Sequence, residues 1–286
     1  MPELPEVQTV VNHLAAKITG KVFSNSQVKV KKMISPDFEK LIKVKRIKKV
    51  SRRGKMIVIA LDNEYYLLIH LKMTGQLIFV DKAGRASGGG HPIKSEGFDL
   101  TKPNKFTHII LNFKDRSRLL FHDVRKFGWM KIVKKDEGEK IFEKFGIEPL
   151  DKDFTLSKFT NILKRYPKQK IKQLLLHQEL IAGIGNIYAD ESLFKAGIKP
   201  TRIVKSLSHK EIKELHQAIK NKLKTAIKYG GTSVNTFVSS SGERGGFVKK
   251  LLVYGRGGQE CLKCGKILTK IKINGRGTVY CPNCQK

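Results

Sequence analysis

Cysteine is missing from the first 260 residues of this 286-residue chain. The four cysteines all stand within the last 26 residues. A disulfide framework needs cysteines spread across the fold, so this distribution excludes a disulfide-stabilised secreted protein. A run of about 18 apolar residues, the length of a membrane-spanning helix, is also missing. The acidic start differs from a signal or transit peptide. We therefore expect a cytoplasmic protein that does not bind a membrane.

Acidic residues are the second scarcity. Asp and Glu number 25 against 57 Lys and Arg, which gives a formal net charge of +32. The basic residues are spread over the whole length instead of forming one tail. A protein with this charge attracts polyanions, so we expect nucleic acid as the partner. The length and the 40% hydrophobic content suffice for two folded domains.

The four cysteines have the spacing of a metal site. Cys261 and Cys264 form one pair, and after sixteen intervening residues Cys281 and Cys284 form a second. Four thiolates at this spacing bind one Zn²⁺ on a short β-hairpin. Such a site is closed and tetrahedral, so we predict a structural zinc. Four unrelated thiols are the alternative.

The tip of this hairpin carries an arginine. Asn274 and Gly275 are typical of a tight turn, and Arg276 stands between two glycines. A guanidinium in this uncrowded place can bind a phosphate with two hydrogen bonds. A solvated arginine is the alternative.

The first six residues combine an amine with a carboxylate. If Met1 is removed, the chain begins with the secondary amine of Pro2, and Glu3 follows as a neighbouring acid/base group. A neutral secondary amine is a nucleophile. The alternative is an ordinary helix start, with Pro5 at the first helical position and Glu6 in the first turn.

The first half of the chain changes from helical to strand periodicity. Apolar residues from Val7 to Ile18 follow the spacing of one helix face, which Gly20 closes. Between residues 21 and 133 short alternating or β-branched runs predict a β-sandwich or flattened barrel. We expect a long surface loop over residues 82–105 because glycine and proline are frequent there. The predicted strands are Val28 and Val30, Met56 to Leu61, Tyr65 to Leu71, Gln76 to Val80, Thr107 to Phe113, Leu119 to His122, and Trp129 to Val133.

The second half is predicted to be mainly helical, so the fold class is α+β. We divide the chain into a helix and β-sandwich domain (1–134), a helical domain (135–230), a flexible loop and linker (231–258), and the zinc finger (259–286). The predicted helices lie near Glu139 to Phe145, Leu156 to Arg165, Ile171 to Leu176, Ile187 to Ala196, and His209 to Tyr229.

A glycine-bounded turn in the helical half is a candidate anion site. Gly183, Gly185 and an expected N-cap Asn186 precede a new helix, whose first N–H groups would point outward. The preceding helix is expected to add the positive charges of Lys168, Lys170 and Lys172. Both features would then face one phosphate backbone. An ordinary helix–helix turn is the alternative.

Three residues on turns of the β half could enter a DNA duplex. The 73–75 turn carries Met73, and the 123–128 turn carries Arg125 and Phe127. Exposed side chains of these types fill the gap that a base leaves when it flips out of the stack. Lys55, just before a predicted strand, is a further cation near this half's turns. Each residue could equally belong to the core or the solvated surface.

Taken together, these residues resemble the bacterial formamidopyrimidine-DNA glycosylase family, whose members remove 8-oxoguanine and ring-opened purines from DNA. The resemblance extends over nearly the whole chain in order. It rests on the segments PELPE, RRGKMIVI, HLKMTG, FHDVRKFG, LIAGIGNIYADESLFKAGIKP, VYGR, and the finger with GRGT and CPNCQK.

The resemblance implies a role for each matching residue. Pro2 corresponds to the nucleophile and Glu3 to its acid/base partner, and Lys55 and Arg276 belong to the reaction centre. It also implies DNA contacts for His108, Arg125, Lys168 and Asn186, insertion of Met73, Arg125 and Phe127 into the duplex, a helix-two-turns-helix in the helical domain, and a loop over residues 232–247 that closes on the flipped base.

The expected activity is base excision from double-stranded DNA that contains oxidised purines, followed by strand cleavage through a Pro2 Schiff base. Zinc serves the fold only, and the protein acts as a monomer. Two alternatives remain. One is an endonuclease VIII-like glycosylase for oxidised pyrimidines, and the other is a non-catalytic zinc-finger protein that only binds DNA.

Overall fold

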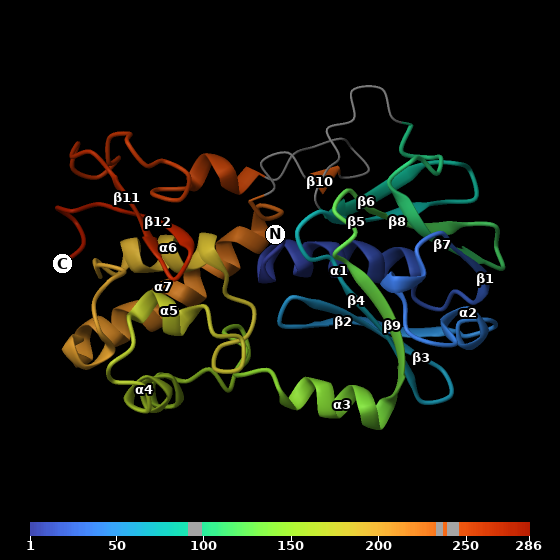
Figure 1. Ribbon diagram of the computed structural model, residues 1–286, viewed down its shortest axis with the longest axis horizontal. Coiled ribbons are helices and arrows are strands. Elements are labelled where there is room, and N and C mark those ends of the chain that lie inside the picture. Colours follow the sequence, from blue (N-terminus) through green and yellow to red (C-terminus); the bar gives the residue numbers. More distant parts are fainter. Residues whose placement is uncertain (91–98, 233–236, 239–245) are drawn as a thin grey trace. The chain divides into compact units, whose positions relative to one another are not determined.

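The computed structural model describes residues 1–90, 99–232, 237–238 and 246–286, which form two compact units. Unit 1 comprises Met1–Glu143 and Tyr229–Val248, and unit 2 comprises Lys144–Lys228 and Lys249–Lys286. Figure 1 shows that most strands belong to unit 1 and most long helices to unit 2. This composition confirms the predicted α+β class.

Unit 1 opens with helix α1 (Leu4–Ile18), which buries the face that the sequence predicts. Val7, Leu14 and Ile18 are fully buried, whereas the opposite face is solvated. Gly20 follows the helix with a φ of +83°, a conformation that glycine adopts without a steric penalty. The 3.6-residue periodicity therefore places one side of α1 in the core of unit 1.

Two antiparallel sheets form the described part of unit 1 and enclose a common core. In the larger sheet the order is β1-β7-β8-β5-β6-β10, and in the smaller it is β2-β3-β4-β9. Apolar residues from both sheets and from α1 make one buried cluster, which confirms the predicted β-sandwich. The strands are β1 (Phe23–Val28), β2 (Ile47–Arg53), β3 (Met56–Leu61), β4 (Tyr65–His70), β5 (Gly75–Val80), β6 (Ala86–Gly90), β7 (Thr107–Phe113), β8 (Arg118–Asp123), β9 (Trp129–Lys134) and β10 (Phe237–Val238).

The expected surface loop over residues 82–105 is wrong in its first part. Strand β6 runs through Ser87 and three glycines and pairs with β5. A Cβ atom on Gly88 would lie 2.1 Å from the carbonyl oxygen of Leu77. The glycines therefore permit a close approach of two strands, although in the sequence they are typical of a loop. Residues 91–98 of the expected loop lie outside the described residues.

Strand β2 and several short elements were not predicted. Strand β2 has only Ile47 and Val50 buried among basic residues, so its apolar alternation is weak. The short helices η1 (Lys31–Met33), α2 (Phe38–Leu41) and, later in the chain, η3 (Gly246–Lys250) provide too few residues for a periodic signal.

Helix α3 (Lys135–Glu143) belongs to unit 1, so the boundary of the unit falls nine residues after the expected one at 134. The Tyr66 hydroxyl donates to Glu139 at 2.8 Å, and the rings of Tyr66 and Phe142 lie 5.4 Å apart. These contacts attach α3 to β4. The four-part division of the chain stays a prediction.

Unit 2 contains four of the five predicted helices, each within one residue of its expected ends, whereas the fifth, expected over Glu139 to Phe145, is α3 of unit 1 and begins four residues earlier. Its core includes the fully buried Phe159, Tyr188 and Leu215. As predicted, the two pairs of cysteines flank an antiparallel hairpin, with positive φ at Asn274 and Gly275 in its two-residue turn. The elements are α4 (Leu156–Lys164), α5 (Ile171–Leu175), α6 (Asn186–Lys195), η2 (Val204–Ser206), α7 (His209–Lys228), β11 (Thr269–Ile273) and β12 (Arg276–Tyr280).

Among the helices of the described ranges, none is both long and apolar enough to cross a membrane.

Candidate active site and DNA interface

The first residues of unit 1 are buried and held in place by the start of α1. Glu3 is the N-cap of the helix, and its backbone N–H donates to Oε2 of Glu6 at 2.9 Å. This reciprocal capping arrangement fixes the backbone at Glu3 and therefore the direction of Pro2. Pro2 is buried and Glu3 is only 3% exposed. Pro5 is the second helical residue, one place later than expected.

The terminal amine lies in an environment that favours its neutral form. Burial lowers the pKa of the Met1 amine below its ordinary value of 8.0, and the charges of Lys55 and Arg125 lower it further. The carboxylates of Glu3 and Glu6 oppose this effect. Pro2, the next residue, is buried.

Lys55 lies in the tight turn between β2 and β3 and is 7% exposed. Gly54, the first residue of this turn, has a φ of +57°, which suits a two-residue hairpin connection. The buried charge of Lys55 lies close enough to the Met1 amine to lower the pKa of that amine. The prediction that Lys55 immediately precedes strand β3 is confirmed.

Glu6 does more than the expected helix-start chemistry. Its Oε1 accepts from the backbone N–H of Thr232 at 2.8 Å and from the Thr232 hydroxyl at 2.9 Å. One carboxylate therefore holds both Glu3 and Thr232, residues that are more than 220 positions apart. Sequence spacing contains no sign of this long-range bond. Most of the segment beyond Thr232 that we expect to close on a base, 233–236 and 239–245, lies outside the described residues.

The three candidate duplex-inserting side chains are exposed on turns. Met73 is 37% exposed, Phe127 is 52% exposed, and Arg125 is also exposed. The guanidinium carbon of Arg125 lies 4.6 Å from the centre of the Phe127 ring, within the range of a cation–π contact. Exposed Met and Phe side chains at turns are available for contact with a partner.

Two histidines lie near these turns. His108, a predicted DNA contact, is 4% exposed, and its Nε2 lies 2.8 Å from the carbonyl oxygen of Asp123. The sequence assigns no role to His70, although this residue stands in the HLKMTG segment. Its Nδ1 accepts from the backbone N–H of Lys72 at 3.0 Å, and burial lowers its pKa to about 3. His70 therefore supports the 73–75 turn as a neutral side chain.

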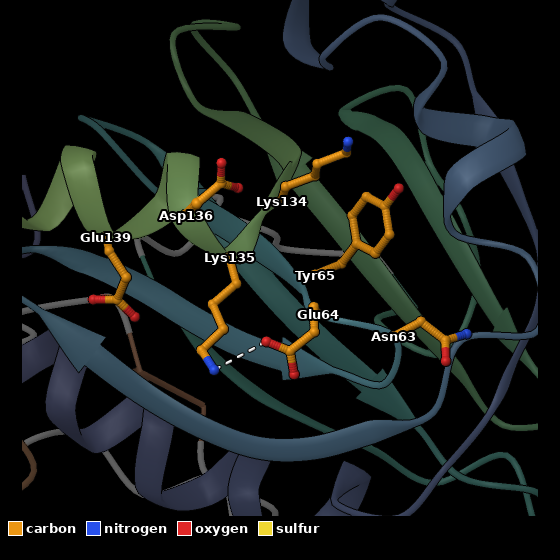
Figure 2. A pocket seen from close by; sticks show the side chains of 7 residues that line it. All are labelled: Asn63, Glu64, Tyr65, Lys134, Lys135, Asp136 and Glu139. Carbon is orange, nitrogen blue, oxygen red and sulfur yellow. Dashed lines mark ion pairs between the residues drawn. The ribbon is translucent and has the colours of Figure 1, made fainter.

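A cleft of about 510 Å³ lies elsewhere on unit 1, at the opposite end of β4 from His70. Figure 2 shows Lys135 extending toward Glu64, to which it pairs at 2.9 Å. The residues that line this cleft do not include a nucleophile paired with an activating base. We therefore do not assign base excision to the cleft. The cleft is lined by Asn63, Glu64, Tyr65, Lys134, Lys135, Asp136 and Glu139.

In unit 2 the glycine-bounded turn is present, but its cap differs from the expectation. Gly185 is the N-cap and Asn186 is the first residue of α6. The Asn186 side-chain N–H therefore reaches the carbonyl oxygen of Gly277 at 2.8 Å and joins the turn to the finger hairpin. Gln178 fixes the turn by accepting from Gly183 N–H at 3.0 Å. Asn186 and the hairpin of Arg276 thus form one surface within unit 2.

The expectation that three lysines of one helix face a phosphate backbone is wrong for Lys172. Its side chain is fully buried, pairs with Asp190 at 2.6 Å and donates to the Thr278 hydroxyl at 2.7 Å. Burial raises the pKa of Asp190 to about 6, against the opposing charge of Lys172. Lys168 and Lys170 are exposed and precede α5, so they remain available to a phosphate.

A second buried carboxylate of α6 holds the segment before the finger. Glu191 is fully buried, and its Oε1 accepts from the backbone N–H groups of Leu252 and Val253 at 2.8 Å and of Tyr254 at 3.1 Å. Its Oε2 pairs with Lys222 at 2.9 Å. The charge is therefore compensated, and α6 anchors the VYGR segment.

The finger brings its four cysteines together as predicted. The sulfur atoms of Cys261, Cys264, Cys281 and Cys284 all lie within 4.8 Å of one another. Four thiolates at this separation fit a tetrahedral zinc site, in which each sulfur lies about 2.3 Å from the ion. Arg276 is exposed at the hairpin tip, beside the two-residue turn.

Comparison with known proteins agrees with this arrangement. Residues 1–130 match the formamidopyrimidine-DNA glycosylase N-terminal domain, residues 145–238 the formamidopyrimidine-DNA glycosylase H2TH domain, and residues 258–286 the zinc finger found in FPG and IleRS. The fold and the site define a DNA-repair glycosylase with a helix-two-turns-helix unit and a structural zinc finger.

Relatives along the full length support the same assignment. A formamidopyrimidine-DNA glycosylase of Listeria monocytogenes serotype 4b (strain F2365) is 42% identical over 292 residues, with all of both chains covered. That of Pelotomaculum thermopropionicum is 40% identical and covers all of this chain and 99% of its own. The chain belongs to the formamidopyrimidine-DNA glycosylase family.

Solved structures of relatives contain DNA. A Lactococcus lactis FPG variant in complex with Fapy-dG-containing DNA has a TM-score of 0.87 and 34% identity, with both chains fully covered. A complex of Lactococcus lactis Fpg with DNA that contains an abasic site has a TM-score of 0.86 and 34% identity, with 99% of each chain covered.

Proposed function

We propose that this glycosylase excises oxidised purines from duplex DNA through a covalent intermediate on Pro2 and then cleaves the strand as a lyase. The observation that carries the proposal is the start of unit 1. There a buried Pro2 and a helix-capping Glu3 lie where burial and Lys55 lower the pKa of the terminal amine.

The chemistry requires a neutral secondary amine, which Pro2 acquires when Met1 is removed. The amine nitrogen forms a bond to C1′ of the damaged nucleotide and loses its proton, while the bond between C1′ and the base breaks and the departing base gains a proton. Glu3 donates a proton to O4′ as the sugar ring opens, which leaves a cationic iminium at C1′. The iminium accepts electrons when C2′ loses a proton, so the 3′ phosphate leaves. Loss of a proton from C4′ into the resulting unsaturated iminium then expels the 5′ phosphate.

The remaining predicted site residues hold the DNA. We infer that Lys168, Asn186 and Arg276 bind phosphates from unit 2, because the Asn186 turn and the Arg276 hairpin are joined by a hydrogen bond. Met73, Arg125 and Phe127 occupy the gap left by the flipped base. His108 is also a predicted DNA contact. Its Nε2 bonds to the Asp123 carbonyl oxygen, so we infer that it acts by supporting the turn that carries Arg125 and Phe127. We expect a monomer that works on DNA in the cytoplasm.

Excision of oxidised pyrimidines is a second candidate activity. It is favoured by a Lactococcus lactis Fpg complex with oxidised-pyrimidine-containing DNA, which has a TM-score of 0.86 and 34% identity to this chain. Single-turnover excision of 8-oxoguanine opposite C and of thymine glycol, measured side by side, distinguishes the two. Faster excision of thymine glycol would contradict our preference for purines.

The covalent proposal is tested by borohydride trapping on a duplex that contains 8-oxoguanine. The wild type should give a stable protein–DNA adduct. Pro2→Glu, in which a bulky second residue retains Met1, should give none. Pro5→Ala is the matched control, because it alters the neighbouring proline of α1 but leaves Pro2. Intact mass spectrometry reports whether Met1 is present in each protein. Equal trapping by wild type and Pro2→Glu would exclude Pro2 as the nucleophile.

A further inference from the structure

The turns that carry the duplex-inserting side chains leave the same end of two paired strands. Strands β5 and β8 are antiparallel, and Gly75 at the start of β5 lies opposite Asp123 at the end of β8. Met73 stands just before β5, whereas Arg125 and Phe127 stand just after β8. The two turns are therefore neighbours across one strand pair.

A buried carboxylate and one hydroxyl join these turns. The Thr74 hydroxyl donates to Oδ1 of Asp123. The backbone N–H of Arg125 lies between them, 3.0 Å from Thr74 Oγ1 and 3.1 Å from Asp123 Oδ1. The other carboxylate oxygen, Oδ2, accepts from Gly128 N–H at 2.7 Å, and Asp123 is fully buried. One side chain thus spans the turn after β8, and Thr74 links it to the turn before β5.

The backbone of both turns is held in conformations that need such support. Lys72 and Lys126 have φ values of 50° and 55°, in the left-handed region, which is strained for residues with a Cβ. Gly128 admits no side chain, since its Cβ would lie 2.6 Å from the Phe121 ring. The Asp123 carbonyl can only accept, so Nε2 of His108 carries the proton of their 2.8 Å hydrogen bond.

We propose that Asp123 is a positioning residue that, through Thr74, holds Met73, Arg125 and Phe127 as one rigid wedge. The inference rests on the proposed insertion of these side chains into the duplex. Because the wedge is ordered before binding, the three side chains lose little conformational freedom when a base leaves the stack. The bond network therefore acts on extrusion of the base and leaves bond cleavage after extrusion unchanged.

Thr74→Val tests this separation, because it removes the hydroxyl but keeps the Asp123 bond to Gly128. We compare single-turnover cleavage of two substrates. In a fully paired 8-oxoguanine duplex the damaged base must be extruded from the stack. A bulged abasic site has no base to extrude. The first rate should fall about tenfold and the second should change by less than about twofold, since only the first includes the cost of unstacking. Thr74→Ser should restore the paired-substrate rate.

Asp115→Asn is the matched control. Asp115 precedes the other end of β8 and accepts from Ser117 N–H at 3.1 Å and from its hydroxyl at 2.6 Å, so it stabilises a turn that carries no inserting residue. This variant should leave unchanged the ratio of the cleavage rate on the paired duplex to the cleavage rate on the abasic site. Asp123→Asn should lower that ratio, and adding Thr74→Val to it should cause little further loss, because both residues act in one network.

An equal loss on both substrates in Thr74→Val would show a merely structural role and overturn the proposal. An unchanged rate on the paired duplex would overturn it as well. Failure of the proposed function is a different result, since the wild type would then form no trapped adduct with either substrate. Thermal unfolding of Asp123→Asn shows whether that variant is folded, and Thr74→Val decides the question if it is not.

Discussion

The N-terminal end of α1 and the tip of the finger hairpin are built in opposite ways. At the first, Glu3 and Glu6 stand three residues apart and fix the chain start by a local capping arrangement. At the second, Asn186 reaches Gly277 across 91 positions, and Lys172 reaches Thr278 across 106. At the proposed reactive end the backbone is therefore fixed by local helix chemistry, with one long-range contact from Glu6 to Thr232. The proposed phosphate surface depends on tertiary contacts of unit 2 throughout. Disturbing each region separately should produce different defects.

Loss of the zinc site should have the largest effect. Cys261→Ser removes one ligand from a site whose zinc contributes about 10–16 kcal/mol of binding free energy in small zinc-finger peptides. We expect DNA binding and excision to be lost together, because the Arg276 hairpin would no longer be ordered. Lys263→Ala, an exposed change between two ligands, is the control. Affinity is measured by fluorescence anisotropy, and tight binding by Cys261→Ser would contradict a structural role for zinc.

Breaking the buried ion pair should come next. Lys172→Met leaves the Asp190 carboxyl buried without its partner, which costs about 3–5 kcal/mol. The paired variant Lys172→Met with Asp190→Leu removes both charges and should recover much of this stability. Chemical denaturation reports the free energy of unfolding of each protein. Equal destabilisation by the single and the paired variant would show that the ion pair is not what holds the hairpin.

The pH dependence of trapping probes the reactive end alone. The neutral amine reacts, so the rate should rise with pH up to the amine pKa and then level off. At the Met1 amine burial and Lys55 lower the pKa, whereas Glu6 raises it, and we expect the charges to act in the same directions on an amine at Pro2. Lys55→Gln should therefore move the rising limb to higher pH, and Glu6→Gln should move it to lower pH. Shifts in the same direction would refute this electrostatic account.

Arg276→Ala should give the smallest effect. Removal of one phosphate contact should make the salt dependence of binding shallower by about 0.9 log–log units. Lys266→Ala, an exposed change in the same finger, is the control for charge alone. A salt slope that equals that of the wild type would show that Arg276 does not bind a phosphate.

Features with a strong local signal were predictable from the sequence. Strands β3 and β7 have the bounds that β-branched runs predict, and α7 follows its 3.6-residue periodicity. The spacing of the four cysteines predicted the finger, because tetrahedral zinc coordination restricts the spacing that its ligands can have. The composition of β6 was misleading, since glycine is usual in loops but here allows two strands to approach closely.

Long-range polar contacts were not predictable. A lysine near an exposed turn is usually solvated, yet Lys172 lies in the core because Asp190 of another helix compensates its charge. Glu6 appeared to serve only the helix start, but it also holds Thr232. Each contact joins residues distant in the sequence, and spacing contains no information about such partners.

The central claim is that the amine of Pro2 forms the bond to DNA, and mapping the trapped adduct tests it most directly. The wild-type protein is reacted with 8-oxoguanine duplex in borohydride, digested with nuclease and protease, and sequenced by mass spectrometry. We predict that the sugar remnant is attached to the nitrogen of an N-terminal Pro2, with Met1 absent. Attachment to a lysine side chain such as Lys55, or to a peptide that begins with Met1, would contradict the account.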